Sequence, residues 1–577
     1  MKQVHISQRP DVDPTLPVFN QVNSVLARIY ASRGISDIQG LGRNLNELLP
    51  DSGLAGMDAA VERLVQAIYQ QQKVLIIGDF DCDGATSTAL AVLALQMMGL
   101  KRLGYLVPNR FEFGYGLSPE IVVEALKQQP ALLVTVDNGI SSVDGVKAAA
   151  LAGLDVIITD HHLAGSELPE ACAIVNPNQP TCGFAAKSTC GVGVIFYVMI
   201  ALRRALQQQG WFEQQGILVP NLATLLDLVA LGTVADVVPL EQNNRVLVHQ
   251  GLQRIKAGYC RPGLKALIEI SGRQQHKLTS ADLGFAIAPR LNAAGRLEDM
   301  SIGIECLLTE SETRARELAS TLNELNQERK GIEQEMQQQA LQLLAGLQLD
   351  KAKLPYGLSL YEPEWHQGVI GILASRIKEK THRPVIAFAQ GDAGELKGSA
   401  RSISGFHVRD GLDAIAARYP QLLKKFGGHA MAAGLTIAAE DLTLFKQAFD
   451  EEVRRQLSTE DLEQQVLTDG VLQASDMTLE LAELIRDAGP WGHQFPEPLF
   501  EGVFSLLQQR LVGQRHLKMV LMEPNSGLAI DAIQFNADLD LWPDEAITKV
   551  RAVYKLDVNE FRGQRNVQML VEHLQPE

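Results

Sequence analysis

Three aspartates at alternate positions, Asp79, Asp81 and Asp83, follow the apolar run Val74–Ile77. In an extended chain this spacing places the carboxylates on one side, where their mutual repulsion calls for a cation. Clustered oxygen ligands suit hard divalent ions such as Mg²⁺ or Mn²⁺. The alternative is an acidic turn that caps a helix starting near Ala85, because Asp and Gly favour turns. The run by itself leaves both interpretations open.

Two further acidic clusters follow apolar runs of the same kind. Asp137-Asn138-Gly139 follows Leu132–Val136, and Asp160-His161-His162 follows Val156–Thr159. If these runs are parallel strands, their carboxyl ends meet in one crevice. Asp236 interrupts another apolar stretch; alone it would be an ordinary cap or surface residue, but beside the others it is a plausible ligand. Carboxylates with one or two imidazoles, and no thiolate, can hold two divalent ions.

Short apolar runs alternate with helical segments between about residue 73 and residue 176. This order predicts an α/β domain with a doubly wound parallel sheet, in which ligands collect beyond the carboxyl ends of the strands. The expected strands are Val74–Ile77, Leu103–Val107, Leu132–Val136, Val156–Thr159 and Ala173–Val175. The expected helices include Thr86–Met98, Pro119–Lys127, Val143–Ala152, Val192–Leu206 and Leu222–Leu231.

The rest of the chain predicts three further parts. Ser311–Gly346 contains no proline, and its apolar positions recur at helical spacing, which predicts a long connecting helix. Its apolar stripe fits a coiled-coil dimer or packing inside the chain, and polar residues that interrupt the stripe favour the latter. Apolar runs between residues 358 and 435 predict a second α/β domain. Short strands after Gln465 predict a small β-barrel or sandwich.

The composition is that of an ordinary globular protein, with 46% hydrophobic and 21% charged residues. No apolar run approaches the roughly 20 residues of a membrane span, and the first residues lack the core of a secretion signal, so we expect a cytoplasmic protein. The six cysteines form no C-x-x-C pair and should be reduced. A net charge of −16 argues against a protein that coats nucleic acid non-specifically.

The four acidic motifs, in this order, resemble the DHH phosphoesterase superfamily. Longer segments are similar to its RecJ family of single-strand-specific exonucleases, from about residue 25 to the end of the chain. These segments are Val107–Phe111, Pro289–Arg296, Trp365–Ile372, Gly398–Ser402 and Phe426–Gly434. The resemblance implies an N-terminal extension (1–50), a DHH catalytic domain (51–308), a connecting helix (309–348), a DHHA1 substrate-binding domain (349–460) and an OB-fold (461–577).

The resemblance also implies how the acids divide between two divalent ions, Mg²⁺ or Mn²⁺. Asp81 would bind one ion and Asp83 the other. Asp137 would bridge the two ions. His161 and Asp236 would complete the second site.

Three further residues would act in catalysis without being assigned to an ion. By resemblance, Asp160 and His162 would orient ligands or contact the phosphate, and His429 would bring an imidazole close to the scissile phosphate. Many relatives carry a histidine four residues before the first ligand, where this chain has Ile77. Asp79 is the natural substitute as a metal ligand, and its role stays open.

A nuclease that acts from a 5′ end must hold the terminal phosphate one nucleotide from the metal ions, and guanidinium groups suit that task. By resemblance, the DNA-binding residues would be Arg110, Arg290, Arg296, Ser399, Arg401, Gly427 and Gly428, with Arg290 the weaker candidate. Phe113 and Tyr115 could stack on bases, although isolated aromatic residues more often pack in a core. In the OB-fold, phosphate contacts would come from Arg510, Arg515, Lys518, Arg562 and Arg565.

The expected activity is 5′-to-3′ hydrolysis of single-stranded DNA to 5′-mononucleotides in DNA repair and recombination. Water is the expected nucleophile, because no serine or cysteine lies in a recognisable nucleophile motif. The resemblance implies a monomer that works with repair proteins such as a helicase or a single-strand-binding protein. One alternative is a DHH-family hydrolase of short oligonucleotides or pyrophosphate, which would lack the C-terminal β domain. Another is a catalytically silent scaffold, which would lack the metal-binding acids.

Overall fold

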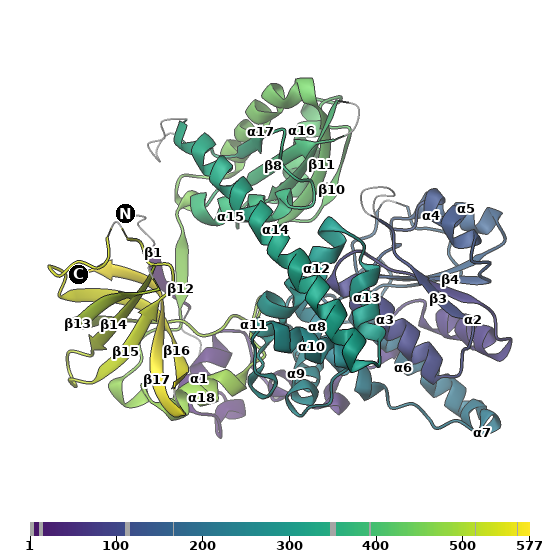
Figure 1. The fold of residues 1–577 in the computed structure, drawn as a ribbon, viewed down its shortest axis with the longest axis horizontal. Coiled ribbons are helices and arrows are strands. Elements are labelled where there is room, and N and C mark those ends of the chain that lie inside the picture. The colour runs from purple at the N-terminus through teal and green to yellow at the C-terminus, as the bar shows by residue number, and fades with distance from the viewer. Residues whose placement is uncertain are drawn as a thin grey trace. The chain divides into compact units, whose positions relative to one another are not determined.

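The computed structural model describes residues 5–10, 15–109, 116–165, 167–346, 354–391, 394–513, 515–539, 541–561 and 563–577 (Figure 1). The chain divides into two compact units. One unit comprises residues 1–7 and 324–466, and the other comprises residues 8–323 and 467–577. Within the described ranges, no helix has both the length and the apolar character needed to cross a bilayer.

The larger unit contains a parallel sheet of five strands in the order β3-β2-β4-β5-β6. The strands are β2 (Val74–Ile77), β3 (Leu103–Leu106), β4 (Leu132–Val136), β5 (Asp155–Thr159) and β6 (Ala173–Val175). Every residue of β2 and β4 is buried, as expected for central strands covered on both faces. The predicted doubly wound parallel sheet is therefore confirmed, with strand bounds within one residue of those expected.

Helices surround this sheet and extend beyond it. α4 and α5 pack through one apolar cluster against the sheet, and α3 and α6 also contact its strands. The helices of this part are α1 (Ser24–Ala31), α2 (Met57–Tyr69), α3 (Cys82–Met97), α4 (Pro119–Leu126), α5 (Val143–Leu151), α6 (Gly191–Gln208), α7 (Trp211–Gln215), α8 (Leu226–Ala235), α9 (Gln242–Lys256), α10 (Pro262–Ile270), α11 (Ser280–Asp282), α12 (Ala288–Leu297) and α13 (Ser301–Leu308). A π-helical turn, Leu283–Ile287, joins α11 to α12.

The acidic run after β2 differs from the expectation. β2 ends at Ile77, and α3 begins at Cys82, inside the run rather than near Ala85. Asp81 is the N-cap residue of α3, and its Oδ1 accepts a hydrogen bond from Gly84 N at 3.0 Å. The argument from alternation along an extended strand was therefore wrong, because a turn and a helix N-terminus place these carboxylates.

The smaller unit has a mixed sheet in the order β10-β11-β9-β8-β7, in which β7 and β8 are parallel and the other pairs antiparallel. Its elements are β7 (Leu358–Tyr361), α15 (Ile370–Thr381), β8 (Val385–Gln390), β9 (Glu395–Arg401), α16 (Val408–Arg418), β10 (Lys425–Gly428), β11 (Ala432–Ala438) and α17 (Leu442–Gln456). Two apolar clusters form its core. The second α/β domain is thus present as predicted.

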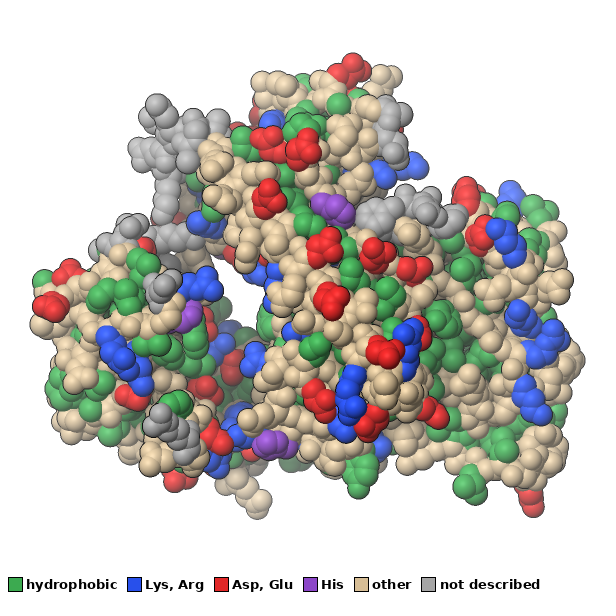
Figure 2. All heavy atoms as spheres, in the orientation of Figure 1, with side chains coloured by type: hydrophobic (Ala, Val, Ile, Leu, Met, Phe, Trp, Pro, Cys, Tyr) green, Lys and Arg blue, Asp and Glu red, His purple; other side chains and the backbone are tan. Residues whose placement is uncertain are grey.

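The long helix α14 (Glu312–Gly346) begins in the larger unit and ends in the smaller one. Its apolar stripe is buried within the chain itself, as packing inside the chain requires. The buried positions are Ala315, Leu318, Leu322, Leu325 and Met336. Figure 2 shows acidic and basic side chains interspersed among hydrophobic and other residues on the face in view.

A closed barrel follows α18 (Leu479–Ala488), with the strand order β13-β14-β15-β17-β16. Its strands are β13 (Phe500–Val512), β14 (His516–Met522), β15 (Ala529–Gln534), β16 (Lys549–Phe561) and β17 (Gln564–Pro576). The predicted C-terminal β-barrel is confirmed. Two short strands, β1 (His5–Gln8) and β12 (Gln465–Thr468), pair with each other ahead of it.

The segment between α18 and the barrel packs against the N-terminal helix α1. Tyr30 stacks on Trp491 and Phe495 with both ring-centroid distances at 6.3 Å. Arg33 also forms a bidentate ion pair with Asp469, which lies between β12 and α18 and whose side chain is 1% exposed. The N-terminal extension is therefore a structural support for the entry into the barrel.

Candidate metal centre

The acidic clusters lie at the carboxyl ends of three neighbouring strands, β2, β4 and β5. Backbone hydrogen bonds carry the sheet pattern past the strand ends, from Asp137 N to Thr159 O and from Asp160 N to Val175 O. Asn138 Nδ2 donates to Ile77 O at 3.1 Å and ties the second cluster to the first. The structure thus brings together the clusters that were expected to converge, because neighbouring parallel strands end at one edge.

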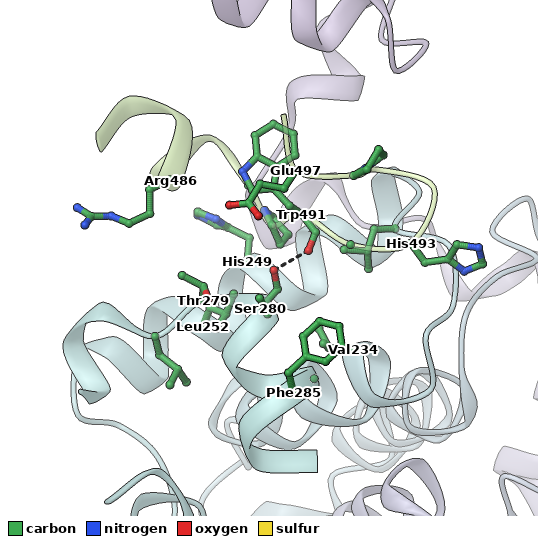
Figure 3. Close-up of a pocket in the computed structure, with 18 of the residues that line it drawn as sticks. Val234, His249, Leu252, Thr279, Ser280, Phe285, Arg486, Trp491, His493 and Glu497 are labelled. Carbon is green, nitrogen blue, oxygen red and sulfur yellow. Dashed lines mark hydrogen bonds between the residues drawn. The ribbon is translucent and has the colours of Figure 1, made fainter. Parts of the chain in front are cut away.

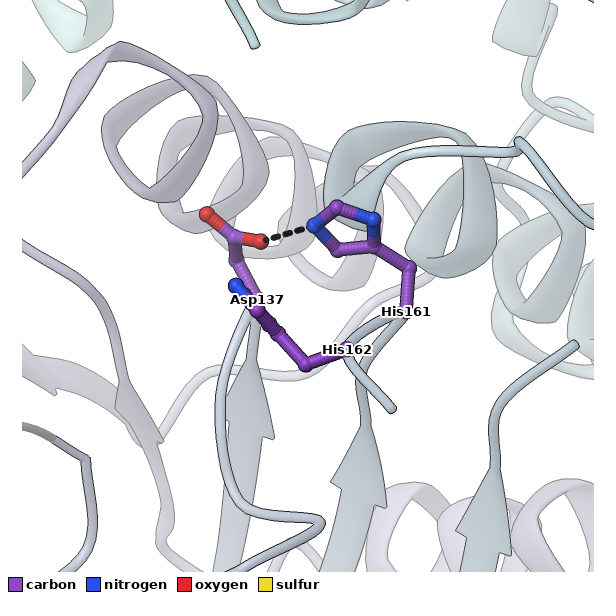
Figure 4. Close-up of side chains that lie close together, drawn as sticks. All are labelled: Asp137, His161 and His162. Atoms are coloured by element: carbon purple, nitrogen blue, oxygen red, sulfur yellow. Dashed lines mark ion pairs between the residues drawn. The ribbon is translucent and has the colours of Figure 1, made fainter. Parts of the chain in front are cut away.

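His161 lies at the centre of this crevice. Its Nε2 atom is 3.1 Å from Asp137 Oδ1 and 3.5 Å from Asp236 Oδ2. Figure 4 shows its ring pointing at the Asp137 carboxylate, with His162 alongside. Two sets of possible ligands share His161: one with Asp137 and His162, and one with Asp83 and Asp236. Within each set the ligand atoms lie within 4.8 Å of one another.

A third possible ligand set consists of Asp79, Asp81 and Asp137. Asp79 is 4% exposed, and Asp137 belongs to this set as well as to one with His161. Ile77, at the position where many relatives have histidine, is fully buried in the core cluster of the sheet. The geometry therefore suits Asp79 as the replacement ligand and Asp137 as the bridging one.

Asp83 is held by the N-terminus of α6. Its Oδ2 accepts from Gly191 N at 2.7 Å and its Oδ1 from Val192 N at 2.9 Å. The positive end of the helix dipole favours a carboxylate there. A Cβ atom on Gly191 would lie 2.6 Å from the Asp137 side chain, so only glycine permits this approach. Sequence reasoning missed Gly191, because it lies outside the recognised motifs, between Cys190 and Val192.

Asp236 occupies an unusual place for an acid, the C-cap of α8. A negative charge is disfavoured at the carboxyl end of a helix, and a bound cation would offset this cost. Gly232, one turn earlier, is a second glycine that sequence reasoning missed. A Cβ atom there would lie 2.8 Å from Asp83 Oδ1, so glycine at this position lets α8 approach α3.

The acids are held against one another in a buried site. Burial and Asp236 raise the pKa of Asp83 to about 7. Burial and Asp81 raise the pKa of Asp236 to about 8, and burial with Asp83 raises the pKa of Asp137 well above its usual value. Burial lowers the pKa of His161, which favours its neutral, ligating form. This repulsive set of oxygen and imidazole donors fits divalent cations.

Asp160 organises the two histidines. Its Oδ1 accepts from the backbone N–H groups of His161 and His162 at 2.7 and 3.1 Å, and its Oδ2 accepts from Ile140 N at 2.9 Å. His162 Nδ1 lies 2.7 Å from the same Oδ1. Although burial opposes both shifts, this hydrogen bond lowers the pKa of Asp160 to about 2 and raises that of His162 to about 9. Asp160 is 1% exposed, so it orients the histidines rather than contacting a substrate.

Helix α12 packs directly on the acidic run. Asn292 Oδ1 accepts from Cys82 N at 2.7 Å, and a Cβ atom on Gly295 would lie 1.7 Å from Phe80 O. The next residue, Arg296, is partly buried in the last turn of this helix. Arg290 is 8% exposed and its guanidinium bonds Ala286 O and Asn323 Oδ1, so it is held within the helices. Asn292 and Gly295 both belong to Pro289–Arg296, one of the segments that carry the resemblance.

Ser399 and Arg401 lie together on β9 of the smaller unit. Arg401 Nη1 donates to Ser399 Oγ at 3.2 Å and to Ala400 O at 2.8 Å. Burial lowers the pKa of Arg401, and no carboxylate contributes to that shift. A Cβ atom on Gly371, in the first turn of α15, would lie 2.9 Å from Arg401 Nη2 and 3.0 Å from Ser399 Oγ. A guanidinium, a hydroxyl and a helix N-terminus together favour a phosphate.

The glycine-rich hairpin beside β9 holds the remaining predicted residues of this unit. Gly427 pairs with Gly434 across β10 and β11. Gly428 has φ of 146°, and a Cβ atom there would lie 2.4 Å from Ala432 O. His429 N donates to Ala432 O at 2.8 Å, closing the turn. The φ of Gly428 and the atoms around its Cβ position require glycine there, whereas a Cβ atom on Gly427 would meet nothing within 4 Å. His429 is the first residue of the turn between β10 and β11.

Other predicted DNA contacts have mixed outcomes. Arg110, Phe113, Tyr115 and Arg562 lie outside the described residues. Arg510 and Lys518 are directly opposite each other on β13 and β14. Arg565 pairs with Glu483 of α18, which holds it against that helix. Arg510 and Lys518 are thus adjacent basic residues on the barrel, and Lys518 also forms an ion pair with Asp531 at 3.4 Å.

Comparisons with known proteins agree with this architecture. Residues 73–233 match the N-terminal domain of the DHH family, residues 354–455 the DHHA1 domain, and residues 468–573 the RecJ OB domain. The chain is 54% identical to the single-stranded-DNA-specific exonuclease RecJ of Escherichia coli K12, over 100% of both chains. It is 51% identical to RecJ of Haemophilus influenzae, over 97% of this chain and 98% of that one.

Solved structures are similar as well. The crystal structure of Thermus thermophilus RecJ in complex with Mn²⁺ matches with a TM-score of 0.80 at 29% identity, over 100% of this chain and 80% of that one. A manganese-bound exonuclease RecJ matches with a TM-score of 0.57 at 34% identity, over 72% and 99% of the two chains.

Proposed function

The chain belongs to the RecJ family of single-stranded-DNA-specific exonucleases, and from this membership we propose that it degrades single strands from the 5′ end, releasing 5′-mononucleotides. It is a phosphodiester hydrolase with DHH, DHHA1 and OB domains, and it acts on single-stranded DNA. The OB domain and full-length similarity leave no support for the alternative of a small-substrate hydrolase. The retained acids likewise disfavour a silent scaffold.

Relatives have been solved with Mn²⁺ and with Mg²⁺, and the acidic sets of this chain fit such ions. In the proposal, Asp79 and Asp81 would hold one ion, Asp83, His161 and Asp236 would hold the other, and Asp137 would contribute to both sites. Divalent ions supply a hydroxide nucleophile near neutral pH and stabilise the developing charge on phosphate oxygens.

The chain's own residues orient the substrate and carry a proton. Asp160 fixes the His162 ring through Nδ1 and, although burial opposes it, raises the pKa of His162 to about 9, so in the protein without metal ions Nε2 also carries a proton at neutral pH. We assign this proton to a phosphate or leaving-group oxygen. His429, in the turn between β10 and β11, is assigned to the scissile phosphate.

The proposed polarity is supported above all by the site at Arg401. The partly buried guanidinium of Arg401 donates to Ser399 Oγ and lies beside the first turn of α15, an arrangement that suits a terminal phosphate. By resemblance, Arg296 and the glycines at 427 and 428 would also contact the DNA. Arg510 and Lys518 would contact phosphates farther along the strand.

The proposal extends to the setting of the enzyme. It would work as a monomer in the cytoplasm, in DNA repair and recombination, on strands supplied by a helicase or bound by a single-strand-binding protein. We propose that the domain bounds implied by the resemblance also separate the functions of the chain. These bounds are 1–50, 51–308, 309–348, 349–460 and 461–577.

An oligonucleotide labelled at one end tests the polarity. With Mn²⁺ or Mg²⁺, a 5′-labelled strand should release labelled mononucleotide at once, and a 3′-labelled strand only at the end of digestion. A blunt duplex is the control for strand specificity. Asp137→Ala should abolish hydrolysis while single-strand binding stays measurable, because its carboxylate lies in the metal centre rather than on the DNA path. Mononucleotides released first from the 3′ end would refute the polarity, and full activity of Asp137→Ala would refute the metal assignment.

A further inference from the structure

The loop between α8 and α9 carries Asp236 and contains a strained residue. Val237, directly after Asp236, has φ of 60°. A β-branched residue is a genuine outlier in the left-handed region, where the C-terminal turn of a helix usually has glycine. The side chain of Val237 is 62% exposed, so burial does not offset the strain. Something else must hold the loop in this conformation.

The peptide that leads from α18 into the barrel supplies the missing contacts. His493 Nδ1 is 2.6 Å from Val237 O, and because the acceptor is a carbonyl, Nδ1 carries the proton and donates it. The His493 backbone O in turn accepts from Leu240 N at 2.9 Å. Arg245 Nη1 donates to Leu240 O at 2.8 Å, and its guanidinium lies 4.3 Å from the centroid of the Phe495 ring. Both ends of the loop are therefore held by one short peptide.

That peptide, Gly489–Glu497, is itself firmly packed. Trp491 stacks on Phe495 with ring centroids 5.1 Å apart. Ser280 Oγ of α11 donates to Trp491 O at 2.6 Å, across a cavity of about 390 Å³ (Figure 3). The peptide lines one side of this cavity, and residues of α8, α9, α11, the π-helical turn, α18 and β16 line other parts of it. It is thus braced against the helices on either side of the loop.

We infer that Gly489–Glu497 is a clamp that positions Asp236, and that His493 is its main positioning residue. The inference rests on the proposed function, in which Asp236 is a metal ligand. Without the His493 bond, Val237 can relax to negative φ, and Asp236, one residue earlier, turns away from His161. The entry into the barrel therefore sets the geometry of the second ion site.

Direct Mn²⁺ binding to the full-length protein, without DNA, tests this. His493→Ala should raise the dissociation constant of one of the two ions roughly tenfold, the usual effect of losing an outer partner of a ligand. His493→Asn keeps a donor near the position of Nδ1 and should bind nearly as tightly as wild type. Adding Val237→Gly to His493→Ala should restore binding, because glycine adopts positive φ without a clamp. Turnover should follow the same order, with KM for single-stranded DNA unchanged.

Two further variants separate the possible failures. His516→Ala, the matched control, removes a barrel histidine whose ring bonds Asn536 N at 3.1 Å, and should leave Mn²⁺ binding unchanged. Asp236→Ala should lose the second ion altogether; unchanged binding there would refute the metal site itself. If Asp236→Ala loses the ion but His493→Ala binds like wild type, or glycine at 237 restores nothing, the clamp is wrong. If His493→Ala does not fold, His493→Gln replaces it in the Mn²⁺-binding measurement, because its amide donor does not lie at the position of Nδ1. Wild-type Mn²⁺ binding by His493→Gln would overturn the inference.

Discussion

Removing divalent ions should expose a pH-dependent penalty at Asp83. Burial and Asp236 raise its pKa in the folded protein from 3.8 to about 7. Between those values the folded state keeps a proton that the unfolded chain has released, so stability falls as pH rises. The penalty is absent below about pH 4 and complete above about pH 7.

The size of the effect follows from the pKa difference. At 1.36 kcal/mol per pKa unit, the complete penalty is on the order of 4 kcal/mol. The variant Asp83→Asn cannot ionise and escapes this penalty. It disturbs the bonds to Gly191 N and Val192 N, but by an amount that does not depend on pH. Between pH 4.5 and 6.5 the stability of the variant relative to wild type should therefore improve by about 2–3 kcal/mol.

Thermal denaturation of the metal-free, full-length proteins at pH 4.5, 5.5 and 6.5 measures this difference. At roughly 2–4 °C per kcal/mol, the relative midpoint should shift by about 5–10 °C across the range. Asp144→Asn, which removes an exposed acid of α5, should show no such trend. Saturating Mn²⁺ should stabilise wild type more than Asp83→Asn, which keeps only the set of Asp79, Asp81 and Asp137 intact. A midpoint difference that is the same at all three pH values would refute the raised pKa and the repulsive centre it describes.

Three other perturbations have defined outcomes. Arg401→Ala should weaken the preference for 5′-phosphorylated over 5′-hydroxyl strands, measured as a ratio of kcat/KM values, and an unchanged ratio would exclude Arg401 from the anchor. Gly295→Ala should inactivate and destabilise the enzyme, because its Cβ atom would lie 1.7 Å from Phe80 O. The control, Gly331→Ala in α14, should change neither activity nor stability, because its Cβ atom would meet nothing within 4 Å. Asp469→Ala should lower the free energy of unfolding by about 3–5 kcal/mol, measured by denaturation, because it leaves the buried Arg33 cation unpaired. Adding Arg33→Leu should recover part of that loss. Equal stability of Asp469→Ala and wild type would contradict this.

Several features of the metal centre could be predicted from sequence because they are local. Apolar runs that end in Asp or His specify buried parallel strands with carboxylates at one edge, and that edge is fixed by the hydrogen bonding of the sheet. Asp79, Asp137 and His161 converge for this reason. The same reasoning failed for the alternation of the first acidic run. A helix that begins at Cys82 competes with strand extension, and the capping preference of Asp81 decides the outcome.

The sequence by itself therefore determined the order of the domains, the acids of the centre and the family. Only the tertiary structure decided how closely helices approach that centre, through Gly191, Gly232 and Gly295, which have nothing in common along the chain. It also decided that Arg290 is held within the helices and that His493, more than 250 residues from Asp236, supports the loop of that acid. Local patterns report the preferences of neighbouring residues, whereas close approach and long-range hydrogen bonds depend on segments that meet only when the whole unit packs.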